Sequence, residues 1–113
     1  MGRLAKFIYY FTNPGIGESE FAIVEQPQDA SGTSGESVDF HVAVRNAPDA
    51  VYQWQYKTTT GTWKDCSSAT TGYNTDTITV TVNATRNGYQ YRCNITSGET
   101  TLTSDAATLT LES

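Results

Sequence analysis

Apolar and polar side chains alternate with a period of two along several short segments of this chain. In residues 76–82, Ile78, Val80 and Val82 would share one face of a strand, and three threonines would share the other. The same alternation predicts strands at residues 36–45, 51–57, 88–96 and 107–111, and the apolar residues 21–25 can supply an edge strand that ends at Gln26-Pro27. Clusters of Gly, Asn, Asp and Ser separate these segments, and none has the periodicity of a helix. The pattern therefore predicts an all-β chain.

The predicted strands carry enough large apolar side chains for one hydrophobic core. A chain of 113 residues has the length of a single small domain, which buries roughly 60–70% of its unfolded surface. The residues predicted to face the core are Val38, Phe40, Val42, Val44, Tyr52, Trp54, Tyr56, Ile78, Val80, Val82, Tyr89, Tyr91, Cys93, Ile95, Ala107, Leu109 and Leu111.

Residues 1–19 stand apart from this pattern. They contain the apolar run Phe7, Ile8, Tyr9, Tyr10 and Phe11, followed by a turn-rich hinge at residues 13–17. This run is shorter than the apolar core of a secretion signal, about 7–15 residues, or a spanning helix of about 20. We therefore divide the chain into an N-terminal anchoring arm, residues 1–19, and a globular domain, residues 20–113. Because the run is too apolar to stay in water, we expect it to dock. It either folds back on its own domain or binds another protein, and the flexible glycines of the hinge favour the second.

The charge of the chain limits its partners. Seven Lys and Arg oppose twelve Asp and Glu, which gives a net charge of −5. A negatively charged domain repels phosphate backbones and anionic lipid. We therefore expect no nucleic-acid partner and no membrane insertion. If Met1 is the natural start, the lack of an export signal predicts that the protein is made in the cytoplasm.

Residues suited to catalysis or metal binding are sparse. The single histidine, His41, alternates with core residues and is expected to face solvent, so no Ser-His-Asp or Cys-His pair is predicted. Asp and Glu are scattered without the spacing of a calcium loop, and no His or Cys cluster suits zinc. We therefore expect no catalytic, metal-binding or cofactor-binding residues, and a protein that is not an enzyme.

Two segments carry a more specific signal. Tyr52-Gln53-Trp54-Gln55-Tyr56 and Asn87-Gly88-Tyr89-Gln90-Tyr91-Arg92-Cys93 resemble the tryptophan strand and the Tyr-x-Cys strand of the immunoglobulin superfamily. With Gln26-Pro27, Gly35-Glu36 and Ala107-Thr108-Leu109, the chain is similar over residues 21–113 to the immunoglobulin-like domains of bacterial surface proteins and tailed-phage virions. The resemblance implies an antiparallel β-sandwich of about seven strands, with Trp54, Tyr91 and Cys93 as its core signature.

The cysteines depart from the antibody pattern. The second strand carries Phe40 and Val42 where antibody domains place the first cysteine of their inter-sheet disulfide, so that bond cannot form. A bond between Cys66 and Cys93 would close a loop of about 27 residues and would stabilise the fold by about 3 kcal/mol. The alternative is two small buried thiols that never pair. The sequence leaves both alternatives open.

Two surfaces are candidates for binding. One is the outer face of the strands at 51–57 and 88–96, where amide and guanidinium groups could hydrogen-bond carbohydrate hydroxyls: Gln53, Gln55, Gln90, Arg92 and Asn94. The alternative for this face is an ordinary hydrated sheet surface. The second candidate is the arm, whose residues 7–11 could add to another protein as a strand or plug.

The resemblance and the arm together predict a non-enzymatic accessory structural protein of a tailed-phage virion, in a head decoration, head fibre or tail. The arm would bind a virion protein or a second copy of the chain. The domain would be displayed on the virion surface, where it would contact host glycans weakly. The alternative is an adhesion or glycan-binding module of a bacterial cell-surface protein, because this fold serves many roles.

Overall fold

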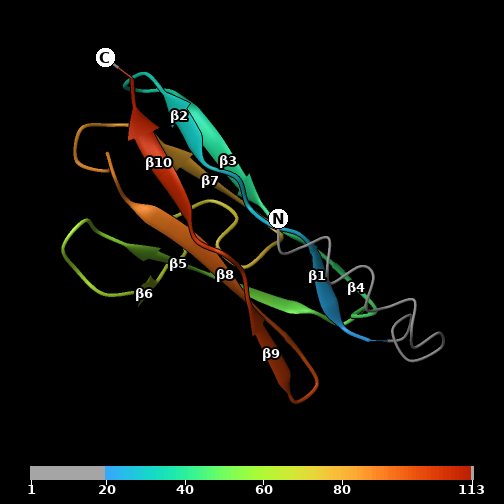
Figure 1. Ribbon diagram of the computed structural model, residues 1–113. Helices are drawn as coiled ribbons and strands as arrows, with labels where there is room; N and C mark the ends of the chain where they lie inside the picture. Colours follow the sequence, from blue (N-terminus) through green and yellow to red (C-terminus); the bar gives the residue numbers. More distant parts are fainter. Residues whose placement is uncertain (1–19, 113) are drawn as a thin grey trace.

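The computed structural model describes residues 20–112, and all regular elements in this part of the chain are β-strands (Figure 1). They are β1 (Ala22–Glu25), β2 (Ala30–Gly32), β3 (Ser37–His41), β4 (Ala43–Arg45), β5 (Val51–Lys57), β6 (Lys64–Asp65), β7 (Thr77–Thr81), β8 (Gln90–Ser97), β9 (Thr100–Thr103) and β10 (Ala107–Leu111). None of the described residues forms a helix long and apolar enough to cross a membrane. The predicted all-β fold is confirmed.

The strands form two layers. The larger sheet has the order β2-β10-β8-β5-β6, and β9 also pairs with β8. The other layer contains two antiparallel pairs, β3 with β7 and β1 with β4. Phe40 of β3 stacks on Tyr91 of β8 with 5.0 Å between the ring centroids, so the two layers share one interior. The short strand β2 pairs in parallel with β10, in contrast to the antiparallel pairing predicted throughout.

The predicted strands at 21–25, 51–57, 76–82, 88–96 and 107–111 correspond to β1, β5, β7, β8 and β10. The segment at 36–45 was predicted as one strand, but it divides at Val42 into β3 and β4. The two parts have different partners, β7 and β1, and the Val42 N–H donates to the carbonyl of Asp76 at 3.0 Å. The chain therefore changes partner strand at this point, and all three residues of β4 are only partly buried.

The core contains the large side chains that the alternation placed on the inner faces. Trp54, Ile78 and Ile95 are completely buried, and the Trp54 indole N–H donates to the carbonyl of Thr75 at 2.7 Å. This bond satisfies the one polar group that the buried indole carries. Trp54, Tyr91 and Cys93 are 0%, 3% and 0% exposed. All three therefore belong to one hydrophobic core, on the inner face of the central strands β5 and β8.

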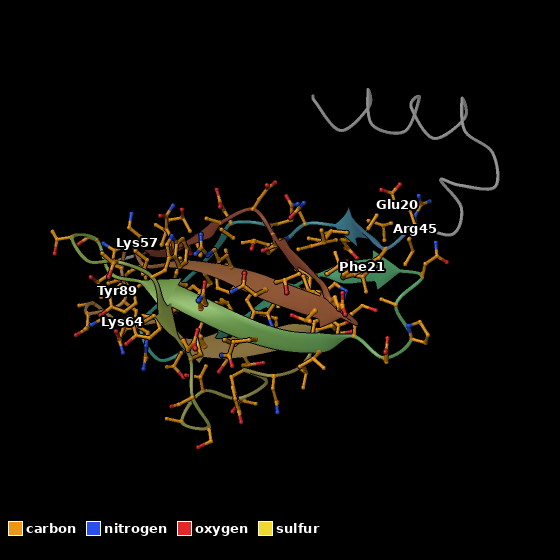
Figure 2. All side chains as sticks on the ribbon, turned by 90° about the horizontal axis from the view of Figure 1, so that it is seen from below. Glu20, Phe21, Arg45, Lys57, Lys64 and Tyr89 are labelled. Atoms are coloured by element: carbon orange, nitrogen blue, oxygen red, sulfur yellow. The ribbon has the colours of Figure 1, made fainter. Side chains whose placement is uncertain are left out.

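The described chain begins at one end of the sandwich. Glu20, Phe21 and Arg45 lie together at that end, whereas Lys57, Lys64 and Tyr89 lie at the opposite end (Figure 2). The predicted arm, residues 1–19 with its apolar run at residues 7–11, lies outside the described residues, as does Ser113. Whatever precedes Glu20 is therefore joined to the domain at the end remote from Tyr89.

Candidate functional site

The five residues predicted as a polar binding face lie on the outer side of the central strand pair. β5 and β8 are antiparallel neighbours, and their register sets Gln53 opposite Asn94 and Gln55 opposite Arg92. Gln90 lies at the start of β8 on the same face. The alternation of the two strands thus brings these side chains together, as the sequence predicted for strands with one buried face.

Most polar groups at the centre of this face are hydrogen-bonded within the domain. The Gln53 side-chain amide donates to the carbonyl of Cys66 at 2.9 Å. The Gln55 amide donates to Asp65 Oδ1 at 2.9 Å, and its oxygen accepts from Arg92 Nε at 2.9 Å. A ligand that bound these groups would first have to break bonds that the free domain already makes.

The two ends of the face also make hydrogen bonds within the domain. Asn94 accepts from the Thr103 hydroxyl at 2.6 Å, and the Gln90 amide donates to Thr108 Oγ1 at 3.4 Å. Between them, the Arg92 guanidinium lies over the ring of Trp63, 4.2 Å from its centroid, which places a loop side chain on the face. The arrangement is that of a hydrated sheet surface with an internal polar network, rather than of amides left free for a ligand.

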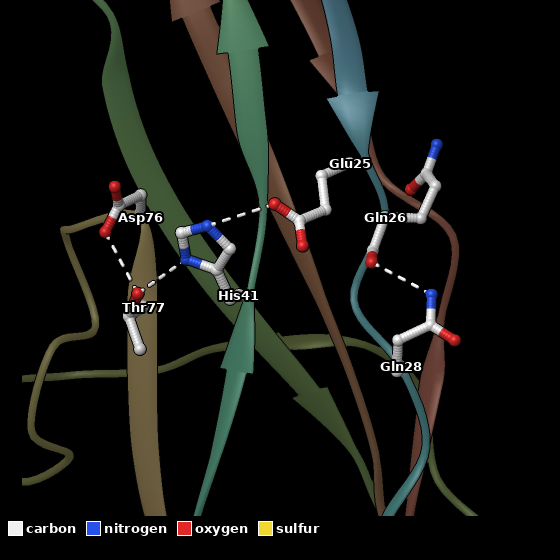
Figure 3. Close-up of polar contacts among 6 residues, drawn as sticks. All are labelled: Glu25, Gln26, Gln28, His41, Asp76 and Thr77. Carbon is white, nitrogen blue, oxygen red and sulfur yellow. Dashed lines mark hydrogen bonds and ion pairs between the residues drawn. The ribbon is translucent and has the colours of Figure 1, made fainter.

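His41 belongs to a chain of polar contacts on the other layer (Figure 3). Its Nδ1 lies 2.7 Å from Thr77 Oγ1, and its Nε2 lies 3.4 Å from Glu25 Oε1. Thr77 Oγ1 also lies 3.0 Å from Asp76 Oδ1. Because a hydroxyl has one hydrogen, Thr77 donates either to Asp76 or to His41, and the tautomer of the imidazole decides which.

The order Glu25, His41, Thr77 resembles that of a hydrolase triad. However, Thr77 Oγ1 also contacts Asp76, and neither His41 nor Thr77 lines the pocket described below, so no substrate space adjoins the hydroxyl there. The His41 side chain is 42% exposed, so it faces solvent only in part, where the sequence predicted a solvent-facing residue. Its contacts with Glu25 and Thr77 link β1, β3 and β7. We interpret these contacts as a polar network of the sheet surface and not as an activated hydroxyl.

A pocket of about 550 Å³ opens between β7 and the ends of β5 and β8. After β6 the chain crosses from the larger sheet to the other layer and forms no strand alongside β7. Only one bridge joins the two, in which the Thr79 N–H donates to the Thr71 carbonyl at 2.9 Å. The space that a further strand would fill is therefore left open, at the end of the sandwich where Tyr89 lies (Figure 2).

Three tyrosines line this pocket. The rings of Tyr56 and Tyr89 are stacked, with 6.0 Å between centroids and 19° between planes. Tyr91 forms the deepest part, because only 3% of its surface is exposed. Its hydroxyl has no hydrogen-bond partner among residues 20–112, so the hydrogen bond of a tyrosine corner is not formed within this part. Burial raises the pKa of Tyr91 to about 12, with the nearby Arg86 acting in the opposite direction, so the phenol is neutral at physiological pH.

Most of the remaining lining residues are polar. Hydroxyls and an amide come from the loop after β6, from β7 and from the loop after β7, including Thr71, Thr81, Asn83 and Thr85. One side chain of each charge is present. Asp65 accepts from Gln55, and the Arg86 guanidinium donates to the carbonyl of Thr81 at 2.9 Å. The pocket is thus overall neutral, and it offers both donors and acceptors.

Both cysteines are free thiols in the structure, and both are buried. Burial raises the pKa of Cys66 to about 11, with a further contribution from Asp65, and burial raises the pKa of Cys93 to about 12. The thiolate is the reactive form of cysteine, so neither residue is suited to nucleophilic chemistry at neutral pH. Among the described residues, His, Cys, Asp and Glu do not form a group of three that could hold a metal ion.

The pocket was not predicted from the sequence. Its residues come from four separate stretches of the chain, at 56, 65–71, 79–86 and 89–91, and each consists locally of part of a strand, a loop or both. The one available signal was the set of tyrosines at positions 56, 89 and 91, which the alternation assigned entirely to the core.

Comparisons with known proteins agree with this architecture. No family model and no curated protein sequence matches the chain. Among solved structures, the domain is similar to titin M4, determined in a trigonal form, with a TM-score of 0.61 and 22% sequence identity. The match covers 81% of this chain and 95% of the titin chain. It confirms the predicted immunoglobulin-like β-sandwich, and at this identity it shows the fold alone.

Proposed function

We propose that this chain is a non-enzymatic accessory structural protein of a tailed-phage virion. The N-terminal arm would attach it to a virion protein, and the immunoglobulin-like domain would be displayed on the particle surface. The proposal combines the fold with the resemblance of residues 21–113 to phage and bacterial immunoglobulin-like domains and with the apolar run at residues 7–11.

The observation that carries this proposal is the polarity of the domain. Glu20, where the arm joins, and Tyr89, beside the pocket, lie at opposite ends of the sandwich (Figure 2). A domain attached through its N-terminal end would therefore hold the pocket away from the attachment point. This geometry suits display, because the anchoring segment and the exposed recognition end do not compete for the same surface.

The polar contacts of His41 support a non-enzymatic role. Thr77 Oγ1 lies within hydrogen-bonding distance of both His41 Nδ1 and Asp76 Oδ1, and neither His41 nor Thr77 lines the pocket. The two cysteine thiols are buried and have raised pKa values, so both are protonated at neutral pH.

Particle association tests the proposal. The full-length chain and a version that begins at Ser19 are each produced in cells that assemble the phage encoding the protein, and the particles are purified on a density gradient. We expect only the full-length chain to band with the particles. A full-length variant with Tyr9→Ser and Tyr10→Ser should also be lost from the particles, whereas the control Thr12→Ser should be retained.

Retention of the version that begins at Ser19 would overturn the role of the arm. Hydrodynamic size and circular dichroism show whether that version is folded, so loss of binding is not confused with loss of structure. Binding of both versions to bacterial cells, without binding to particles, would instead favour the adhesion module of a bacterial surface protein.

A further inference from the structure

The pocket beside Tyr89 has the composition of a binding site for a neutral, hydroxyl-rich ligand. Its volume of about 550 Å³ lies within the range of small-molecule sites, roughly 300–1,000 Å³. The pocket exists because the chain after β6 joins β7 through a single bridge and does not pair along it, which leaves the interior open at this point. Such a space accommodates one or two rings of a small ligand.

The most specific feature of the pocket is a hydrogen-bonding group on its wall. Tyr91 is only 3% exposed overall and lines the pocket, and its hydroxyl makes no hydrogen bond to another residue among residues 20–112. The hydroxyl oxygen itself is not sealed from solvent, so water or a ligand in the pocket can pair with it. The phenol is neutral, so it can both donate and accept.

The walls select the chemistry of the ligand. Tyr56 and Tyr89 provide flat, partly buried aromatic surface that can pack against the C–H face of a ring. The hydroxyls of Thr71, Thr81 and Thr85 form no hydrogen bonds within the described part of the domain, so they remain free to pair with hydroxyl groups. A sugar ring presents both of these surfaces at once.

Charge disfavours an anionic ligand. The negative charge of Asp65 and the positive charge of Arg86 cancel in the lining of the pocket. One guanidinium nitrogen of Arg86 already donates to the backbone carbonyl of Thr81. A phosphate or carboxylate would need a surplus of cationic donors, which this lining lacks. A purely apolar ligand would leave the threonine hydroxyls unpaired, together with the side-chain NH₂ of Asn83, whose Oδ1 already accepts from the Arg86 N–H.

We propose that this pocket binds one or two residues of a neutral saccharide, with the Tyr91 hydroxyl hydrogen-bonding the ring substituent that enters deepest. This site is distinct from the polar face around Gln53 and Asn94, whose groups are already hydrogen-bonded to other residues of the domain. The inference deepens the proposed function and rests on it only for the source of the sugar, a polysaccharide on the host surface. The pocket itself can be tested without any particle.

The test is a titration of the full-length, isotope-labelled chain followed by amide NMR. The probes are glucose, galactose, mannose, N-acetylglucosamine and their disaccharides, with inorganic phosphate and adenosine as contrasts. We expect saturable shifts at Tyr56, Asn83 and Tyr89, with a Kd of about 1 mM for the best sugar because few ligand atoms are engaged. The amides of Gln53 and Asn94 should not shift. Soluble host polysaccharide, added in a separate arm, distinguishes a surface glycan from a free sugar as the source.

Two matched variants locate the binding. Tyr91→Phe removes only the hydroxyl and should weaken binding about three- to tenfold without lowering the thermal midpoint, because no hydrogen bond of the free domain is lost. Tyr52→Phe removes a hydroxyl from a half-buried tyrosine outside the pocket and should leave binding unchanged.

The saccharide proposal is overturned if the sugars cause no shift at the pocket at concentrations well above this Kd. It is also overturned if they shift the face of Gln53 and Asn94 instead, if phosphate or adenosine binds in their place, or if both tyrosine variants weaken binding equally. Failure here leaves the particle association of the arm unaffected, so the two proposals fail separately.

Discussion

The backbone N–H of Cys66 donates to the carbonyl oxygen of Trp54 at 2.9 Å. Trp54 is also the direct cross-strand partner of Cys93 in the pairing of β5 with β8. Both cysteines are therefore held next to the central tryptophan, one by the segment after β6 and the other by the strand itself. In this arrangement the thiols act as small apolar side chains of the core, with 6% and 0% of their surface exposed.

This burial predicts that the thiols of the native protein react slowly. At about pH 8, a thiol reagent such as Ellman's reagent should label neither cysteine at an appreciable rate, since burial raises both pKa values and blocks access. In urea both should react at the rate of a free thiol. Rapid labelling of the native protein would contradict the burial. Two unlabelled cysteines in urea, together with a mass lower by two hydrogens, would show that a disulfide had formed instead.

The same groups predict a loss of stability in alkaline solution. Cys66, Cys93 and Tyr91 have folded pKa values of about 11, 12 and 12, raised by burial from ordinary values of 9.0, 9.0 and 10.0. As pH rises above about 9, the unfolded chain loses these protons before the folded chain does. Their contribution to stability is therefore complete below about pH 8 and is lost progressively between about pH 9 and 12.

Urea unfolding from about pH 7 to about pH 10.5 measures this effect. The contribution of these three groups to the free energy of unfolding should be nearly constant up to about pH 8 and should decline at higher pH. Cys66→Ala should be less stable at neutral pH but should decline less steeply, because one of the titrating groups is gone. An equal slope in the variant and the parent would mean that Cys66 titrates alike in the folded and unfolded chains.

The strands that could be predicted are those whose buried residues alternate. β5 and β7 follow this pattern because one side of each contacts the core, and this contact selects large apolar residues at every second position. The strands β2, β6 and β9 were missed. Their sequences, ASG, KD and TTLT, are short and mostly polar, since these strands lie at sheet edges or extend beyond the core. Their pairing is determined by the position of the neighbouring strand and not by their own composition.

The candidate sites show a similar division. The register of β5 and β8 follows from the alternation, so the grouping of Gln53, Gln55, Arg92 and Asn94 was predictable. Their internal hydrogen bonds were not, because Asp65 and Thr103 come from strands that the sequence did not indicate. The pocket depends on a missing strand beside β7, which no local pattern reports.

Ser104 is a buried polar residue that the sequence analysis did not single out. Its hydroxyl accepts from the backbone N–H of Cys93 at 2.9 Å and donates to the carbonyl of Asp105 at 2.8 Å, between β9 and β10. Ser104→Ala should lower the free energy of unfolding by about 1–3 kcal/mol, because a buried N–H loses its acceptor. The control Ser97→Ala, which removes a surface bond to Asp49, should cost less than about 0.5 kcal/mol.

Urea unfolding of both serine variants checks this prediction, and hydrogen exchange adds a local measurement. The amide of Cys93 should exchange faster in Ser104→Ala, whereas amides in β3 and β7 should change only with global stability. Equal stability of the two variants would imply that water or a rearranged backbone replaces the Ser104 hydroxyl as acceptor.

Gly72 occupies the segment that crosses between the layers, and its conformation excludes a side chain. Its φ is +82°, and a Cβ placed on it would collide with the backbone carbonyl oxygen of Thr77. Gly35 also has a positive φ, +95°, but nothing lies within 4 Å of the position that its Cβ would take. The two glycines therefore separate the cost of backbone conformation from the cost of a collision.

We expect Gly35→Ala to lower the free energy of unfolding by about 1–2 kcal/mol, the usual penalty for a side chain in a left-handed conformation. Gly72→Ala should cost about 3 kcal/mol or more, because the backbone of residues 72 and 77 must also move apart. Chemical denaturation of both variants measures the difference. If the two substitutions cost the same, the segment after β6 can shift away from β7 without loss, and the wall that it forms for the pocket would then be adaptable and not fixed.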